Sequence, residues 1–212
     1  MYNKIAILAR PRTGSTSLYR MLESHLHPKG FQCFYEPYNP KNYVSYYKEG
    51  FDFDYIDPFF KYDQVLTKTL FGCSQHPKKS TGNDERRFTD WMKEFFDKVI
   101  VLDRRDKGLQ AESLLINLDS KIGWDIPKIY DVNKIDQERL KNEIESFKYF
   151  SDKMTSIAEQ NSWPIFYYED LFVYHSISEI ARMLEYIGVE IENDVIYDYI
   201  ISDKRKVRID PD

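Results

Sequence analysis

Residues Ala9–Leu18, ARPRTGSTSL, contain the residue types of a loop that holds an anion. An apolar run at 5–9 precedes them, and apolar residues at helical spacing follow. A loop between a strand and a helix turns backbone N–H groups and the positive end of the helix dipole outward, and its hydroxyls add donors. Arg10 and Arg12 crowd this helix start, which repels cations. We therefore expect an oxyanion to bind here.

This loop departs from the pattern of nucleotide hydrolases, G-x-x-x-x-G-K-[ST], in which Lys contacts phosphates and Ser or Thr contacts magnesium. With Gly14 as the second glycine of that pattern, Ala9 stands at the first glycine and Ser15 at the lysine. The positive charge lies instead at Arg12, before the glycine. The loop can still bind an oxyanion, but it lacks the usual arrangement for Mg-ATP. A polar turn with a Ser or Thr helix cap is the structural alternative.

A second basic turn follows another apolar run, in VIVLDRRDKGLQAESLL at 99–115. Asp106 can cap the helix that starts there, and Gln110 and Ser113 share one face of it. Arg105 precedes Ser113 by eight residues and could converge with it by folding back over the first helical turns. Taken alone, this segment is equally typical of a solvated Arg-Arg-Asp turn.

Together, the two motifs resemble those of sulfotransferases that use 3′-phosphoadenosine 5′-phosphosulfate (PAPS). In that family a P-[KR]-[ST]-G-[ST]-[ST] loop binds the 5′-phosphosulfate, and an Arg and a Ser eight residues apart bind the 3′-phosphate. Residues 11–16 match the first motif, and RRDKGLQAES at 104–113 is most similar to the bacterial carbohydrate sulfotransferases, including the trehalose type. The resemblance implies PAPS as donor, its desulfated product PAP, and no metal. It assigns the nucleotide to Arg12, Thr13, Gly14, Ser15, Thr16, Ser17, Arg105 and Ser113.

Three further segments resemble the same family, in the same order along the chain. FYEP at 34–37 is similar to the segment with the catalytic Glu of carbohydrate sulfotransferases, and LTKTL at 66–70 to a strand whose Lys points at the transferred group. FYYEDL at 166–171 is similar to a stretch that precedes the family's late helix. For the acidic pair Glu169 and Asp170 we expect a structural role, in binding loop N–H groups.

The resemblance implies catalytic roles for Glu36, Arg12 and Lys68. Glu36 would take the proton of the acceptor, Arg12 would stabilise charge on the leaving oxygen, and Lys68 would bind a sulfuryl or bridging oxygen. The residues themselves leave other interpretations open. Glu36 could lie in an exposed turn and Lys68 could be a snorkelling lysine, while His25 and His27 are other candidate bases.

Composition limits the class of partner. The chain has 212 residues, a formal net charge of −5 and two cysteines, whose spacing suits neither a metal site nor a redox pair. This charge does not favour nucleic acid, so we expect a small-molecule or carbohydrate acceptor. The apolar run at 5–9 is too short for a membrane span or a signal peptide. We expect a cytoplasmic protein without a membrane span, and its oligomeric state is left open.

Strands and helices are expected to alternate. Apolar runs predict strands at 4–9, 32–35, 65–70, 99–102 and 164–168. Helical periodicity predicts helices from residue 15 and at 88–96, 107–118, 136–160 and 177–187. This order indicates an α/β fold, a three-layer α/β/α domain with a central parallel sheet, and the resemblance specifies the P-loop-like sulfotransferase type. We expect one domain, 1–212, with the aromatic segments 38–62 and 119–133 over the acceptor.

Two other functions are compatible with these residues. One is an ATP-dependent kinase with an unusual phosphate loop, and the other is a catalytically inactive module that binds PAP or another nucleotide. Binding of PAP or of Mg-ATP distinguishes the sulfotransferase from the kinase. Transfer activity distinguishes the sulfotransferase from the inactive binding module.

Overall fold

The computed structural model describes residues 4–36, 62–71, 82–119 and 135–190. The predicted acceptor segments 38–62 and 119–133 lie almost wholly outside these ranges, so their role stays a prediction. Within the described helices, none has the length and apolar composition needed to cross a membrane.

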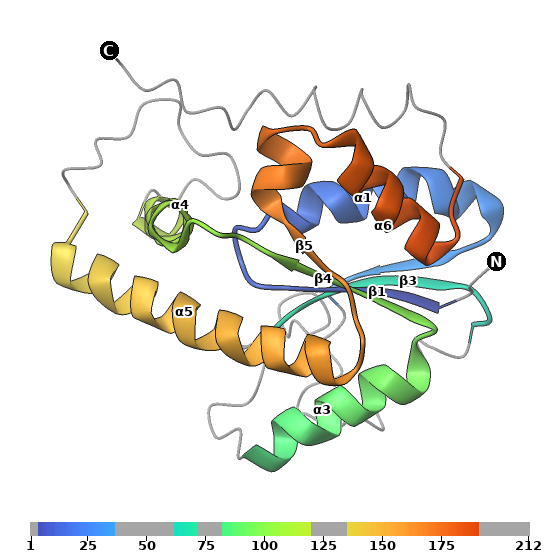
Figure 1. Cartoon of the computed structure of the whole chain (residues 1–212), viewed down its shortest axis with the longest axis horizontal. Coiled ribbons are helices and arrows are strands. Elements are labelled where there is room, and N and C mark those ends of the chain that lie inside the picture. The colour runs from blue at the N-terminus through green and yellow to red at the C-terminus, as the bar shows by residue number, and fades with distance from the viewer. Residues whose placement is uncertain (1–3, 37–61, 72–81, 120–134, 191–212) are drawn as a thin grey trace.

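The centre of the fold is a parallel sheet with the strand order β2-β3-β1-β4-β5 (Figure 1). Ile7 of the central strand faces Lys68 on one side and Ile100 on the other. A strand with neighbours on both sides and helices on both faces is apolar throughout, which explains the continuous run IAILA. The strands are β1 (Lys4–Ala9), β2 (Gln32–Tyr35), β3 (Val65–Leu70), β4 (Lys98–Asp103) and β5 (Ile165–Tyr167).

Helices cover both faces of this sheet. In Figure 1, α1 (Ser15–Leu26) and α6 (Ile177–Ile187) lie on one face, and α3 (Gly82–Phe95) and α5 (Gln137–Gln160) on the other. The side chains of β1 alternate between two cores: Ile5 and Ile7 join the core under α1 and α6, whereas Ala6 and Leu8 join the other. The three-layer α/β/α arrangement is thereby confirmed.

The sequence predicted one of the three remaining helices and missed the other two. The helix α4 (Lys107–Asp119) packs beside α5, as Figure 1 shows, and was expected from its periodicity. After β5 the chain forms a π-helix, η5 (Glu169–Val173), and after α1 a short 3-10 helix, η1 (His27–Lys29), neither of which was predicted.

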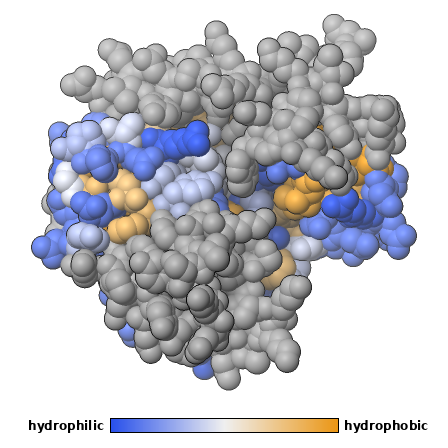
Figure 2. Space-filling view, turned by 180° about the vertical axis from the view of Figure 1, so that it is seen from behind, coloured by the Kyte–Doolittle hydropathy of each residue, from blue (hydrophilic) through white to orange (hydrophobic). Residues whose placement is uncertain are grey.

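On the face seen in Figure 2, the described surface is mainly hydrophilic, with smaller apolar areas between.

Local signals account for where several helices begin and end. The Asp136 side chain accepts a hydrogen bond from Arg139 N–H at the start of α5, and Ser176 does the same for Glu179 at the start of α6. The helix α6 ends at Gly188, whose φ of 66° is the left-handed conformation that glycine adopts easily.

Candidate functional site

The first loop joins β1 to α1 in an unusual backbone conformation. Arg12 has φ 65° and Gly14, the residue before α1, has φ 75°. No side chain caps α1, so the alternative of a Ser or Thr cap is wrong. Thr13 instead bonds back to the Arg10 carbonyl at 2.8 Å. The N–H groups of the first helical turn have no acceptor within the helix, and α1 therefore begins as an anion-binding end would.

Gly14 is required by packing as well as by conformation. A Cβ atom at this position would lie 2.8 Å from Phe172 Cε2 and 2.9 Å from Tyr168 Cδ2. Tyr168 directly precedes η5 and Phe172 lies within it; their rings, 5.3 Å apart between centroids, pack on the loop. The segment after β5 thus holds the first loop in place.

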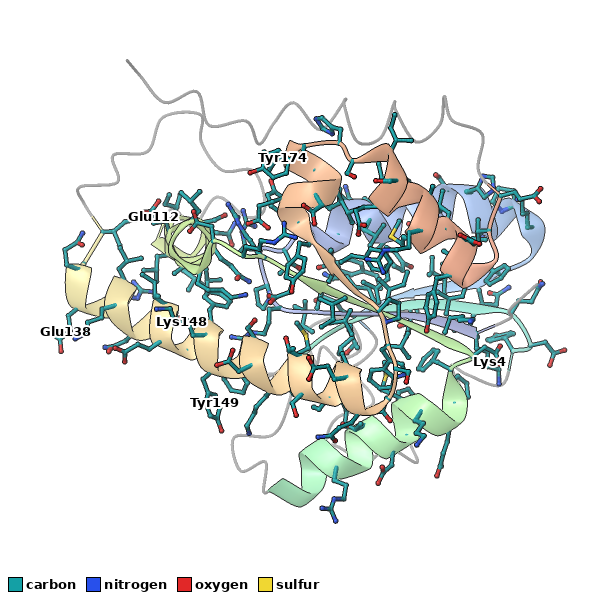
Figure 3. The ribbon with its side chains drawn as sticks, in the orientation of Figure 1. Lys4, Glu112, Glu138, Lys148, Tyr149 and Tyr174 are labelled. Carbon is teal, nitrogen blue, oxygen red and sulfur yellow. The ribbon has the colours of Figure 1, made fainter. Side chains whose placement is uncertain are left out.

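Arg10 points away from the start of α1, although from the sequence we expected it with Arg12 at that helix start. Its Nη1 donates to the Phe71 carbonyl at 2.8 Å, and its guanidinium lies 4.9 and 4.5 Å from the ring centroids of Phe147 and Phe150 of α5. The strand alternation is the reason, because residues 6, 8 and 10 all face the layer that contains α5. Tyr149, which lies between these two phenylalanines in the sequence, is exposed and points to the outer side of α5 (Figure 3).

Arg12 turns toward α4. Its Nε donates to the Ser113 hydroxyl at 2.8 Å. Burial, and then the positive charge of Arg104, lower the pKa of the Arg12 guanidinium, while Tyr168 acts in the opposite direction. The Gln110 side chain, which is fully buried, donates from Nε2 to the Pro11 carbonyl at 2.7 Å. Two contacts therefore join the first loop to α4, on which Glu112 is labelled in Figure 3.

The second basic turn is organised by carboxylates. Asp106 accepts from Leu109 N–H at 2.8 Å and caps α4, as predicted. Glu169 of η5 accepts from the backbone N–H groups of Arg105 and Asp106, at 3.0 and 3.1 Å. The predicted role of Glu169, binding loop N–H groups, is confirmed. Because this carboxylate already occupies the backbone donors of the turn, an anion bound there depends on side chains.

Arg105 is held by its own counter-ion. Its two terminal nitrogens bond the two oxygens of Asp170, each at 2.7 Å, and its guanidinium lies 4.0 Å from the Tyr167 ring centroid. The hydrogen bond to Asp170 raises the pKa of Arg105 and lowers that of Asp170. The structure thus brings Ser113 to Arg12, while the guanidinium of Arg105 is turned to Asp170. A guanidinium bonded in this way still has three of its five N–H groups for another anion.

The third component is a buried cluster at the ends of β2 and β3. Lys68 and Glu36 form an ion pair, with side chains only 2% and 1% exposed. Lys68 Nζ also lies 3.2 Å from the Thr16 hydroxyl and 3.3 Å from the Tyr35 hydroxyl, which are 3.0 Å from each other. The cluster connects the first turn of α1 with the residue that follows β2. Sequence reasoning missed Tyr35, whose only signal was its place before Glu36.

Glu36 is a buried residue and not part of an exposed turn, and Lys68 does not snorkel to solvent. Glu36 has φ 47°, and its N–H donates to the Lys68 carbonyl at 3.0 Å, which extends the β2–β3 pairing by one residue. The other candidate bases, His25 and His27, lie at the opposite end of α1 from the loop, about 15 Å away along the helix. Among the described residues, no cluster of His, Cys, Asp or Glu could hold a metal ion.

Comparisons with known proteins support the fold. No protein-family model and no curated protein matches the sequence. The crystal structure of mouse sulfotransferase SULT7A1 complexed with PAP matches 94% of this chain with a TM-score of 0.57 and 11% identity. The match spans 63% of the mouse chain, so this chain covers less than two thirds of it.

A sulfotransferase domain from the Synechococcus PCC 7002 olefin synthase also matches, over 95% of this chain and 80% of that one, with a TM-score of 0.43 and 15% identity. Together with the parallel sheet and its flanking helices, the match to the mouse structure shows that this chain has an α/β sulfotransferase fold.

Proposed function

We propose that this chain is a PAPS-dependent sulfotransferase that transfers a sulfuryl group to a hydroxyl, or an amine, of a carbohydrate or small-molecule acceptor in the cytoplasm. The observation that carries the proposal is the buried contact between Glu36, Lys68 and Thr16. In this contact a carboxylate and a cation lie near the start of α1, within a sulfotransferase fold, and this supports the assignment of Glu36 as base and of Lys68 as a charge-stabilising group.

Two sets of residues would bind the donor nucleotide. The first loop offers the N–H groups at the start of α1, the Arg12 guanidinium and the hydroxyls of 15–17 to the 5′-phosphosulfate. Arg105 and Ser113 would bind the 3′-phosphate, with Arg105 using the N–H groups that Asp170 leaves available. Both sets follow the carboxyl ends of parallel strands, where ligands of such sheets bind.

The chemistry requires a proton acceptor and a cation. As the acceptor oxygen forms its bond to sulfur, the bond from sulfur to the phosphate oxygen breaks, and the acceptor's proton passes to Glu36. Lys68 supports this step because its ion pair with Glu36 holds the carboxylate in position. Arg12 and Lys68 would stabilise the negative charge that develops on the leaving phosphate oxygen.

Binding separates this function from the kinase. The wild-type protein is mixed with PAP, with Mg-ATP or with buffer alone, and its thermal unfolding is followed. Stabilisation by PAP and not by Mg-ATP supports the sulfotransferase, whereas stabilisation only by Mg-ATP would refute it and favour the kinase. If PAP binds but a panel of carbohydrate and small-molecule acceptors receives no sulfate from labelled PAPS, the inactive binding module is favoured.

Variants then test the assigned roles. Glu36→Gln and Arg12→Ala should abolish transfer, and Glu36→Gln should leave PAP affinity nearly unchanged because Glu36 is assigned to the acceptor and not to the nucleotide. Arg105→Ala should weaken PAP binding. Glu94→Gln is the matched control, since Glu94 is exposed on α3, on the other face of the sheet. Full activity of Glu36→Gln on the true acceptor would show that another group is the base.

A further inference from the structure

Arg104 and Arg105 are adjacent in sequence but point to different parts of the site. Arg105 is bonded to Asp170 beside η5. Arg104 turns to the first loop: its Nη1 lies 3.4 Å from the Arg12 carbonyl oxygen, and its guanidinium carbon lies 4.6 Å from the Tyr168 ring centroid. Arg104 therefore belongs to the first loop by position, although the second turn supplies it.

The positive charge of Arg104 is poorly compensated. Among the described carboxylates, only Glu169 is within salt-bridge distance, with 3.9 Å between Arg104 Nε and Oε1. That carboxylate already accepts two backbone N–H groups of the second turn. The Nε atom of Arg104 is buried and has no hydrogen-bond partner in the described part of the chain.

Arg12 has no oppositely charged partner among the residues that the structure describes. Its side chain bonds a neutral hydroxyl, that of Ser113, and its described surroundings contribute a second cation, Arg104. Besides burial, the positive charge of Arg104 lowers the pKa of Arg12, as is expected for two neighbouring like charges. Buried charges are unfavourable unless they are paired, so two neighbouring guanidinium groups indicate a place for an anion.

We propose that Arg104 is a further donor-binding residue: together with Arg12, it clamps the oxyanion that the first loop binds. This inference rests on the proposed function. The two guanidinium groups present planar N–H donors, the geometry that suits phosphate and sulfate oxygens. The second turn thus contributes to both ends of the donor: Arg104 to its 5′-phosphosulfate and Arg105 to its 3′-phosphate. The pair also explains why the first loop needs no lysine at position 15.

A structural role and a clamp role predict opposite signs for the same substitution. If Arg104 only supports the fold, Arg104→Gln destabilises the free protein. If Arg104 is half of an anion clamp, its removal relieves like-charge repulsion in the free protein and weakens anion binding. Unfolding temperature without ligand, together with ligand affinity, therefore distinguishes the two roles.

The experiment compares wild type, Arg104→Gln and Arg182→Gln by calorimetric titration with inorganic pyrophosphate and with PAP. Arg182 is a matched control because its guanidinium also lies over a ring, 4.1 Å from the Phe166 centroid, and pairs with Glu179 of its own helix α6. We expect Arg104→Gln to bind both probes about tenfold more weakly than wild type. Its unfolding temperature without ligand should be equal to that of wild type or higher, and Arg182→Gln should bind both probes like wild type.

Each outcome decides one of the two proposals. If wild type binds pyrophosphate more tightly than Arg104→Gln does but does not bind PAP, the proposed function is refuted and the clamp is supported. Wild-type affinity of Arg104→Gln for both probes would overturn the clamp and leave the function standing, as would a lower unfolding temperature of the free variant or its failure to fold. If wild type binds neither pyrophosphate nor PAP, both proposals are overturned.

Discussion

Replacement of Lys68 by methionine tests the buried ion pair most directly. Methionine keeps most of the lysine side-chain volume, so the substitution removes a charge and three hydrogen-bond donors without a large cavity. It removes the Lys68 charge from beside the Glu36 carboxylate, whose side chain is 1% exposed. Thr16 and Tyr35 can keep their own hydrogen bond of 3.0 Å, so the loss is concentrated at Glu36.

The expected loss follows from the burial of the pair. Removal of one partner from a buried pair typically costs about 3–5 kcal/mol of unfolding free energy, because the remaining charge stays buried. Neutralising Glu36 as well should restore part of the lost unfolding free energy. The double variant Lys68→Met/Glu36→Gln has a neutral amide in place of the buried charge, and a buried neutral group that loses a hydrogen-bond partner costs about 1–3 kcal/mol. We therefore expect the double variant to be more stable than Lys68→Met alone.

The assay is urea unfolding followed by circular dichroism, with the unfolding free energy extrapolated to water. Lys93→Met serves as control, since Lys93 is exposed on α3, and it should change the free energy by less than about 0.5 kcal/mol. A change below about 1 kcal/mol for Lys68→Met would refute the reasoning, as would a double variant whose loss equals the sum of the single losses.

Three further perturbations test the elements around the cluster. Gly14→Ala should lower the unfolding free energy by about 2–5 kcal/mol, since its left-handed backbone and the contact with Phe172 both resist a Cβ atom, and Phe172→Ala in that background should restore the steric part. The hydrogen bond to Arg105 holds the pKa of Asp170 below 3.8, so the pair stabilises the fold fully above pH 3.8 and progressively less below it. The small stability difference between wild type and Asp170→Asn, measured by thermal unfolding, should therefore vanish as the pH falls from 7 toward 2. Burial, and then the charge of Glu23, raises the pKa of the Cys33 thiol from 9.0 to about 12. At pH 8 the thiolate fraction of Cys33, and therefore its alkylation rate, should be about a thousandfold lower than for an ordinary thiol. Mass spectrometry of the labelled peptide measures that rate.

The sequence predicted the elements and their order well, because the periodicity of apolar residues is a local property. The run IAILA and the spacing of Leu18, Met21 and Leu22 sufficed to place β1 and α1. The π-helix η5 gave no such signal. Its residues EDLFV have no period of their own, and the contacts of Tyr168 and Phe172 with Gly14 form only when the β5 end meets the first loop.

Residue types and spacing also predicted where the candidate site lies, because the carboxyl ends of parallel strands meet at one edge of the sheet. Which arginine faces which partner was decided by tertiary structure alone. Arg10 passes to the α5 side by strand alternation, Arg105 meets Asp170, and Arg104 reaches the first loop. A long charged side chain that follows a strand has several partners within reach, and the packing of segments distant in sequence selects among them.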